Sequence, residues 1–205
     1  MSTHSLYNLV PEITLAAALA WGSGIRLYAV LLIIGLSGYS GWLDLPPHLA
    51  VLAHPLVLCA SGFMTLVEFG ADKVPWIDSV WDAVHTLIRV PAGAALAAAV
   101  FGAGDASITV AAAILGGTIA AGTHFAKAGG RAALNASPEP FSNWAASFAE
   151  DVLVPSGLWL AVAHPAAFLV ALALFALAAL VLARALVTGL GMLMRGLRAR
   201  MQGVP

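Results

Sequence analysis

The sequence is poor in charge and in cysteine. Charged residues make up only 9% of its 205 residues, with a net charge of −1, whereas a soluble domain carries about 25%. No basic field suggests nucleic acid as a partner. The single cysteine, Cys59, lies in an apolar run, which excludes a disulfide framework and predicts a buried thiol. No nucleophile elbow, Walker loop, metalloprotease or dinucleotide motif is present, so we expect neither an enzyme nor a cofactor.

What the chain has in excess is long apolar runs. Hydrophobic residues reach 61% and the mean hydropathy is +0.94. The stretches "VAAAILGGTIAAG" (110–122) and "PAAFLVALALFALAALVLA" (165–183) carry no charge, and about 20 apolar residues cross a hydrocarbon core of about 30 Å. The composition predicts an all-α, polytopic helical membrane protein whose first partner is the lipid bilayer.

We expect six membrane segments, at about 10–38, 48–71, 77–103, 107–128, 141–163 and 165–187. Three of them contain helix-weakening residues in mid-run, within "WGSGIR" (21–26), "VPAG" (90–93) and "VPSG" (154–157). An alternative makes 77–103 and 141–163 re-entrant hairpins that turn at their prolines. The predicted helix breaks are Gly22, Gly24, Pro91, Gly93, Pro155 and Gly157.

Lysine and arginine indicate the orientation. They follow the second segment (Lys73), the fourth (Lys127 and Arg131) and the sixth (Arg184, Arg195, Arg198 and Arg200), and the opposite connections have none. By the positive-inside rule these places are cytoplasmic. With six crossings both termini are then cytoplasmic, in a bacterial-type inner (plasma) membrane. We divide the chain into a transmembrane domain, 1–187, and a basic amphipathic tail, 188–205, on the membrane surface.

An internal repeat relates 48–103 to 107–163. In each unit an apolar helix ends in a polar residue followed by Phe (Glu68-Phe69 and His124-Phe125), and a polar helix then reaches VPAG or VPSG. Transporters are often built from such repeats, with the substrate site where the repeats meet.

Charge is concentrated in "ADKVPWIDSVWDAVHTLIRVPAG" (71–93). On a helix Asp78, Asp82, His85 and Arg89 share one face. In the second unit Asn143, Ser147 and Glu150 repeat this spacing, with Asp151 adjacent. Charged groups within a bilayer face the protein interior or water. They either pair structurally or line a path. The candidate path residues are Arg26, Glu68, Asp72, Asp78, Asp82, His85, Arg89, His124, Asn143, Glu150 and Asp151.

A metal site has weaker support. Asp82 and His85, with Glu68 and His124, are plausible ligands. The chain offers neither thiolates nor a His-x-x-x-His pair beside them, and these are the usual features of a transition-metal site. We therefore expect no bound metal.

Two stretches carry a family resemblance: "GSGIRLYAVLLIIGL" (22–36) and "VEFGADKVPWIDSVWDAVHTLIRVPAG" (67–93). They resemble the membrane proteins grouped as domain of unknown function 4126, from about residue 12 to about 185. The resemblance implies a membrane location and no particular activity. The positions that match its pattern are Glu68, Asp72, Lys73, Pro75, Asp78, Trp81, Asp82, Arg89, Pro91 and Gly93.

Two hypotheses about function remain. The first is a small transporter or channel for an unknown ion or small solute, with its path between the two repeat units. In it Glu68, Asp82 and Glu150 bind the cation, Arg26 and Arg89 balance charge, and His85 and His124 confer pH sensitivity. The second is a non-transporting membrane scaffold whose buried charges pair structurally. Either can include a homo-oligomer.

Overall fold

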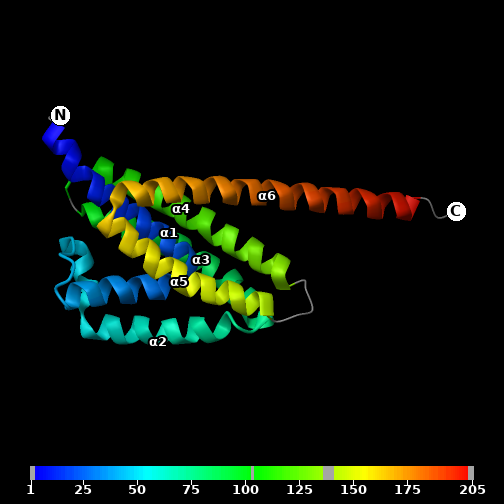
Figure 1. Ribbon diagram of the computed structural model, residues 1–205, viewed down its shortest axis with the longest axis horizontal. Helices are drawn as coiled ribbons and strands as arrows, with labels where there is room; N and C mark the ends of the chain where they lie inside the picture. The colour runs from blue at the N-terminus through cyan, green and yellow to red at the C-terminus, as the bar shows by residue number, and fades with distance from the viewer. Residues whose placement is uncertain (1–2, 103, 136–140, 203–205) are drawn as a thin grey trace.

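The computed structural model describes residues 3–102, 104–135 and 141–202, and this part of the chain consists of helices joined by short links. The last three residues of the predicted tail lie outside these ranges. Six α-helices and one short 3₁₀ helix follow one another, as Figure 1 shows: α1 (Thr3–Tyr39), η1 (Pro47–Ala53), α2 (Pro55–Ala71), α3 (Pro75–Phe101), α4 (Ala106–Asn135), α5 (Phe141–Ala163) and α6 (Pro165–Gln202). Five helices are long and apolar enough to span a membrane, and η1 with α2 makes a sixth candidate. The all-α class is confirmed, and over the described residues the structure offers five candidate spans, or six with the bent pair, where six were predicted.

The first segment does not cross the bundle. Helix α1 breaks at Arg26, whose backbone is non-helical (φ −140°, ψ 76°), and its second half turns back beside its first (Figure 1). A Cβ on Gly22 would lie 2.7 Å from Cγ2 of Val30, eight residues later, whereas a straight helix separates such residues by about 12 Å. Helix α1 is therefore a re-entrant hairpin with its tip at "WGSGIR".

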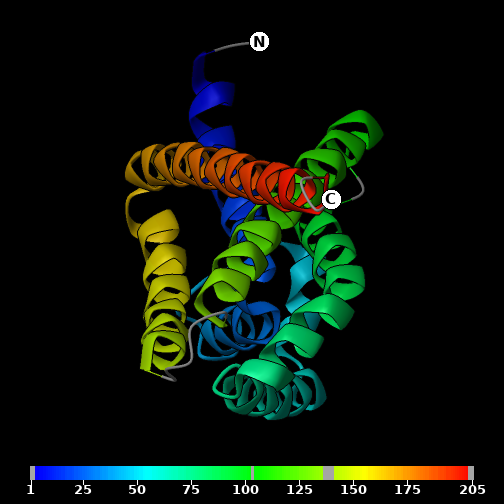
Figure 2. The same cartoon turned by 90° about the vertical axis from the view of Figure 1, so that its right-hand side faces the viewer.

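This path changes the predicted topology. Leu9 and Ile13 of the first half line one cavity with Phe101 and Ile108, and His48, beyond the second half, packs against Gly102. Both ends of the hairpin thus lie at one end of the bundle, which we call the N-terminal end. Helices α2 to α6 then cross it five times, and α6 leaves at the opposite, C-terminal end (Figures 1 and 2). The prediction that both termini share one side is therefore wrong.

The predicted breaks at the two VPxG motifs are also wrong. Helices α3 and α5 continue through Pro91 and Pro155, which also excludes the alternative in which these segments are re-entrant. The glycines serve packing instead. A Cβ on Gly93 would collide with Ala120 and approach Ser23, and one on Gly157 would collide with the Trp21 ring. The VPxG glycines of α3 and α5 therefore both pack against the first half of α1, close to its tip.

The core is divided along the bundle. Apolar side chains from the two halves of α1 and from η1, such as Leu19, Val30, Ile34 and Leu49, are almost completely buried near the N-terminal end. The buried charges lie from the hairpin tip toward the C-terminal end. Cys59, on α2, is exposed rather than buried as predicted, because α2 presents much of its surface to the surroundings.

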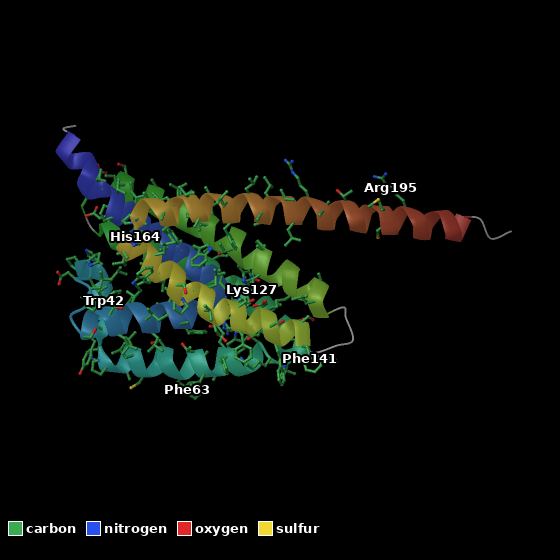
Figure 3. All side chains as sticks on the ribbon, in the orientation of Figure 1. Trp42, Phe63, Lys127, Phe141, His164 and Arg195 are labelled. Carbon is green, nitrogen blue, oxygen red and sulfur yellow. The ribbon has the colours of Figure 1, made fainter. Side chains whose placement is uncertain are left out.

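Helix α6 stands apart from the rest of the bundle. Only 6% of its most apolar window is buried, and two edge-on ring contacts from Trp21 to Phe168 and Phe175 hold its first part. It continues without a break into the predicted tail and extends past the other helices, where Figure 3 shows Arg195.

Candidate functional site: a buried charge network around the α1 tip

The predicted stripe on α3 faces inward. Asp78, Asp82, His85 and Arg89 are 0–4% exposed. The opposite face carries apolar side chains such as Leu87, which is 81% exposed. Helix α3 is thus polar inside and apolar outside. This is the expected arrangement for charged residues in a membrane helix, since lipid cannot solvate them.

The innermost part of the site is centred on Arg89, which is fully buried. Its Nη2 donates to Oε1 of Glu68 at 2.6 Å and its Nη1 to Oδ1 of Asp82 at 2.7 Å. Glu68 comes from the last turn of α2, so Arg89 ties α2 to α3. These are short, charge-assisted bonds, the strongest class of hydrogen bond in proteins.

His124 of α4 completes this inner cluster. Arg89 Nη1 lies 3.1 Å from its Nδ1, and Oγ1 of Thr86 lies 2.7 Å from its Nε2. Because a guanidinium only donates, Nδ1 must accept. The geometry assigns a neutral imidazole with its proton on Nε2, directed at the Thr86 hydroxyl. His85 lies in a separate contact, stacked on Trp81 and 3.1 Å from the Tyr28 hydroxyl.

Arg26, at the hairpin tip, contacts both of the segments that were predicted to be repeat units, 48–103 and 107–163. It lies 2.9 Å from Asp72 in the link between α2 and α3 and 3.0 Å from Asp151 of α5. It also donates to the hydroxyl and the carbonyl of Ser147. The helix break places a cation between the two units at the point where they meet, so the tip is an integral part of the site.

Lys127 of α4 connects the inner cluster around Arg89 to the contacts that Arg26 makes at the hairpin tip. Its Nζ lies 2.9 Å from Asp72, 3.3 Å from Glu150 and 3.6 Å from Asp82, and it donates to the carbonyl of Ile25 at the tip. Figure 3 shows Lys127 in the middle of the bundle.

Arg131, one turn further along α4, binds Glu150 at 2.9 Å and the Asn143 side chain at 2.6 Å. Asp78 is fully buried and interacts electrostatically with Arg131. All eleven predicted path residues therefore lie in or beside one continuous network.

Sequence reasoning missed three cations of this network, Lys73, Lys127 and Arg131, although Lys73 does lie in its predicted connection, between α2 and α3. Lys127 and Arg131 were assigned to a cytoplasmic connection, but α4 continues to Asn135 and buries both. A signal was available, because His124, Lys127 and Arg131 are spaced i, i+3 and i+7 and therefore share one helix face.

The link between α2 and α3 contains two groups with shifted pKa values. Burial alone would raise the pKa of the Asp72 carboxyl, but Lys127 and Arg26 outweigh it and hold that pKa below 3.8. Burial lowers the pKa of Lys73 below 10.5, against the attraction of Asp151. Asp72 is therefore ionised at neutral pH and acts as a fixed anion between Arg26 and Lys127.

The charge network, defined by its eleven charged side chains, does not balance. Its acids are Glu68, Asp72, Asp78, Asp82, Glu150 and Asp151, and its bases are Arg26, Lys73, Arg89, Lys127 and Arg131. With all eleven groups ionised, six acids against five bases give a formal net charge of −1.

Oxygen atoms within the network are also left without partners. One carboxylate oxygen each of Glu68, Asp72 and Asp82 is buried with no hydrogen bond. Over the described residues, no three His, Cys, Asp or Glu side chains are grouped closely enough to hold a metal ion.

Comparison with known proteins agrees with the family resemblance. No curated protein and no solved structure matches the chain. The family model described as "Domain of unknown function (DUF4126)" matches residues 13–185, which include the α1 tip and all eleven charged side chains of the network. The chain is a membrane-spanning helical protein and belongs to this family of unknown function.

Proposed function

We propose that this protein is a small membrane transporter that binds one proton or monovalent cation in its charge network. The observation that carries the proposal is the net charge of −1 of that network. An uncompensated charge is costly to bury, and uptake of one positive charge would balance six acids against five bases. The cation-binding groups in this proposal are Glu68 and Asp82, which share Arg89 and keep one free oxygen each, and Glu150.

The re-entrant α1 hairpin supports a transport role. Non-helical backbone at membrane depth occurs where it is buried in protein or lines a cavity, and transporter sites are often formed at such broken helices. Here the break carries Arg26, which contacts Asp72 of the first repeat unit and Asp151 of the second. A change of charge in the network can therefore act on both units through one side chain.

A second candidate is the membrane scaffold. It is favoured by the observation that all five bases of the network lie within 4.0 Å of an acid. Closely packed apolar residues around Leu19 and Ile34 also separate the network from the N-terminal end. In this alternative the charges hold the hairpin and the two units together and bind no ion.

For orientation, we propose a bacterial-type inner membrane with the C-terminal end of the bundle in the cytoplasm. Lys73 lies in the link between α2 and α3 at that end, and α6, which leaves the bundle there (Figure 1), carries Arg184 and Arg195 in its second half. The first forty residues have one arginine, Arg26, and no lysine. By the positive-inside rule the start of α1 is then on the outer side.

The test is ion flux in proteoliposomes. Wild type is compared with Asp82→Asn, which removes one charge from the inner cluster, and with Asp105→Asn, which removes an exposed acid outside the network. We expect flux of protons or of Na⁺ or K⁺ that Asp82→Asn abolishes and Asp105→Asn preserves. Absence of flux for protons, Na⁺, K⁺ and chloride in folded wild type would reject the transport of these ions and leave the scaffold and the transport of an organic solute.

A further inference from the structure

Helices α4 and α6 are separated by an open space. Ring contacts from Trp21 hold the first part of α6, and from there α4 and α6 diverge toward the C-terminal end (Figure 1). A cavity of about 460 Å³ lies between the two helices. A Cβ on Gly122, which lines this cavity, would meet no atom within 4 Å. The space between the helices is therefore not filled by the side chains of the protein.

The cavity has the length of one leaflet of a bilayer. On α4 its lining extends from Thr118 to Gly129, and on α6 from Leu172 to Ala183. Each stretch covers about 16 Å, at about 1.5 Å per residue, and this is about half of a hydrocarbon core of about 30 Å. Because α4 and α6 both run from the N-terminal to the C-terminal end, the cavity lies in the leaflet at the C-terminal end.

The walls of the cavity suit an acyl chain. Small residues from both helices keep the space wide, and they are Gly122, Ala126 and Gly129 of α4 and Ala176, Ala179 and Ala183 of α6. The hydroxyl groups of Thr118 and Thr123 already donate to backbone carbonyls, so the lining offers little to a polar ligand. The volume would hold roughly 15 groups of about 30 Å³, the share of one water molecule in the liquid. A methylene group is of similar size, so the space is about that of one acyl chain.

The charge beyond the cavity is complementary to an anionic headgroup. Arg184 directly follows Ala183 and is exposed, and Arg195 lies further along the same helix. From Pro165 to Gln202, α6 carries no acidic residue. Arginine near a membrane surface attracts anionic lipids, and its long stem lets the guanidinium reach the level of the headgroups.

We propose that the cavity between α4 and α6 holds one acyl chain of an anionic phospholipid from the leaflet at the C-terminal end, with the headgroup at Arg184. A second cavity, which shares Ala126 and Ala179 with the first, is lined by Lys127 and Glu150 of the charge network. The acyl chain separates these two charged groups from the rest of the bilayer. Such a lipid binds whether or not the network transports an ion, because its site depends on the shape of the cavity and on Arg184.

The experiment measures lipid binding to the delipidated full-length protein in detergent. Native mass spectrometry counts the bound lipids during titration with dioleoyl-phosphatidylglycerol, which is anionic, and with dioleoyl-phosphatidylcholine, which has the same chains and no net charge. We expect one tightly bound lipid per chain. Phosphatidylglycerol should bind about fivefold more tightly, the factor that one arginine near a membrane surface contributes. Equal affinity for the two lipids would overturn the proposal, and so would a lipid-free dimer, in which a second copy of the chain covers the cavity.

A first pair of variants tests the cavity. Ala179→Phe fills it and is expected to weaken the binding of both lipids at least fivefold. Ala173→Phe, at an exposed position of α6 outside the cavity lining, is the matched control and should bind like wild type. Unchanged binding by folded Ala179→Phe would overturn the proposal.

A second pair of variants tests the headgroup and requires no change in the packed part of the protein. Arg184→Gln is expected to remove the fivefold preference for phosphatidylglycerol and to leave the binding of phosphatidylcholine unchanged. Arg195→Gln, further along the exposed part of α6, should keep the preference. Equal losses in the two variants would overturn the proposal, because they would show a general attraction of a basic helix for anionic lipid.

Discussion

Replacing Arg89 by methionine is expected to destabilise the protein strongly, because Arg89 compensates two buried acids. Its guanidinium is fully buried and lies 2.6 Å from Glu68 and 2.7 Å from Asp82. Breaking a buried ion pair by removing one partner costs about 3–5 kcal/mol. Methionine keeps most of the apolar stem, so the loss of packing is small. We therefore expect Arg89→Met to lower the free energy of unfolding by about 3–5 kcal/mol.

A compensating variant separates charge from packing. Replacing a whole buried ion cluster by neutral groups of similar size is often neutral or stabilising. The triple variant Arg89→Met, Glu68→Gln and Asp82→Asn should therefore regain most of the stability lost by Arg89→Met alone. Both proteins are compared by reversible unfolding in mixed micelles at neutral pH, with Arg195→Met on the exposed part of α6 as the control. We expect this control to stay within about 0.5 kcal/mol of wild type.

Two results would refute this reasoning. A loss below about 1 kcal/mol for Arg89→Met, in the range of an exposed ion pair, would mean that the two acids find other compensation. A triple variant as unstable as the single one would mean that the shape of the arginine matters and its charge does not. Either result would show that the inner cluster is not the main electrostatic connection between α2 and α3.

Three further predictions follow from the packing, the topology and the pKa of Asp72. Gly24→Ala should destabilise the protein by more than about 2 kcal/mol, because its Cβ would collide with Thr123 and the Ala120 carbonyl. The control Gly122→Ala meets open space and should be neutral or stabilising. Thermal unfolding compares the two variants, and equal stability would refute the close approach of the α1 tip to α4. Tags at the two ends of the chain should be accessible from opposite sides of the membrane in intact cells, and labelling of both from one side would refute the re-entrant path of α1. The pKa of Asp72 is lower in the folded protein than its usual 3.8, so its contribution to stability is present above pH 3.8 and is lost as the pH falls through the folded value. In Asp72→Asn the free energy of unfolding should therefore depend less on pH in this acidic range. An unchanged pH dependence would contradict the lowered pKa of Asp72.

Much of the site could be predicted from the sequence. The 3.6-residue period of α3 and the cost of charge in lipid together place Asp78, Asp82, His85 and Arg89 on one inward face, and the structure buries all four. The same two arguments also place Lys127 and Arg131 on an inward face of α4. The positive-inside rule instead led us to assign them to a connection. The rule describes where charge gathers, but it cannot distinguish a charge in a loop from one buried in the last turns of a helix.

The helix breaks could be predicted only in part: a break within "WGSGIR" was predicted and lies at Arg26, whereas the two predicted at the VPxG motifs are absent from α3 and α5. Proline inside a helix removes one hydrogen bond and crowds the carbonyl four residues earlier, but neighbouring groups in a membrane protein can satisfy that carbonyl. Helices α3 and α5 remain continuous at Pro91 and Pro155. At the tip of α1, the reversal depends on partners from other helices: Lys127 binds the Ile25 carbonyl, and Ser147 and Asp72 bind Arg26. None of these partners is near the tip in the sequence.

The sequence by itself determined the membrane class, the number of apolar segments and the inward face of the charged helix. Each follows from local composition and from the low polarity of lipid, which act on every segment separately. Only the tertiary structure decided that α1 turns back, that its arginine lies between the two repeat units, and that the network carries one acid more than its bases. These depend on which distant side chains come together. A buried charge is stable only beside such partners, so the pairing that fixes the site is set by the packing of the whole bundle.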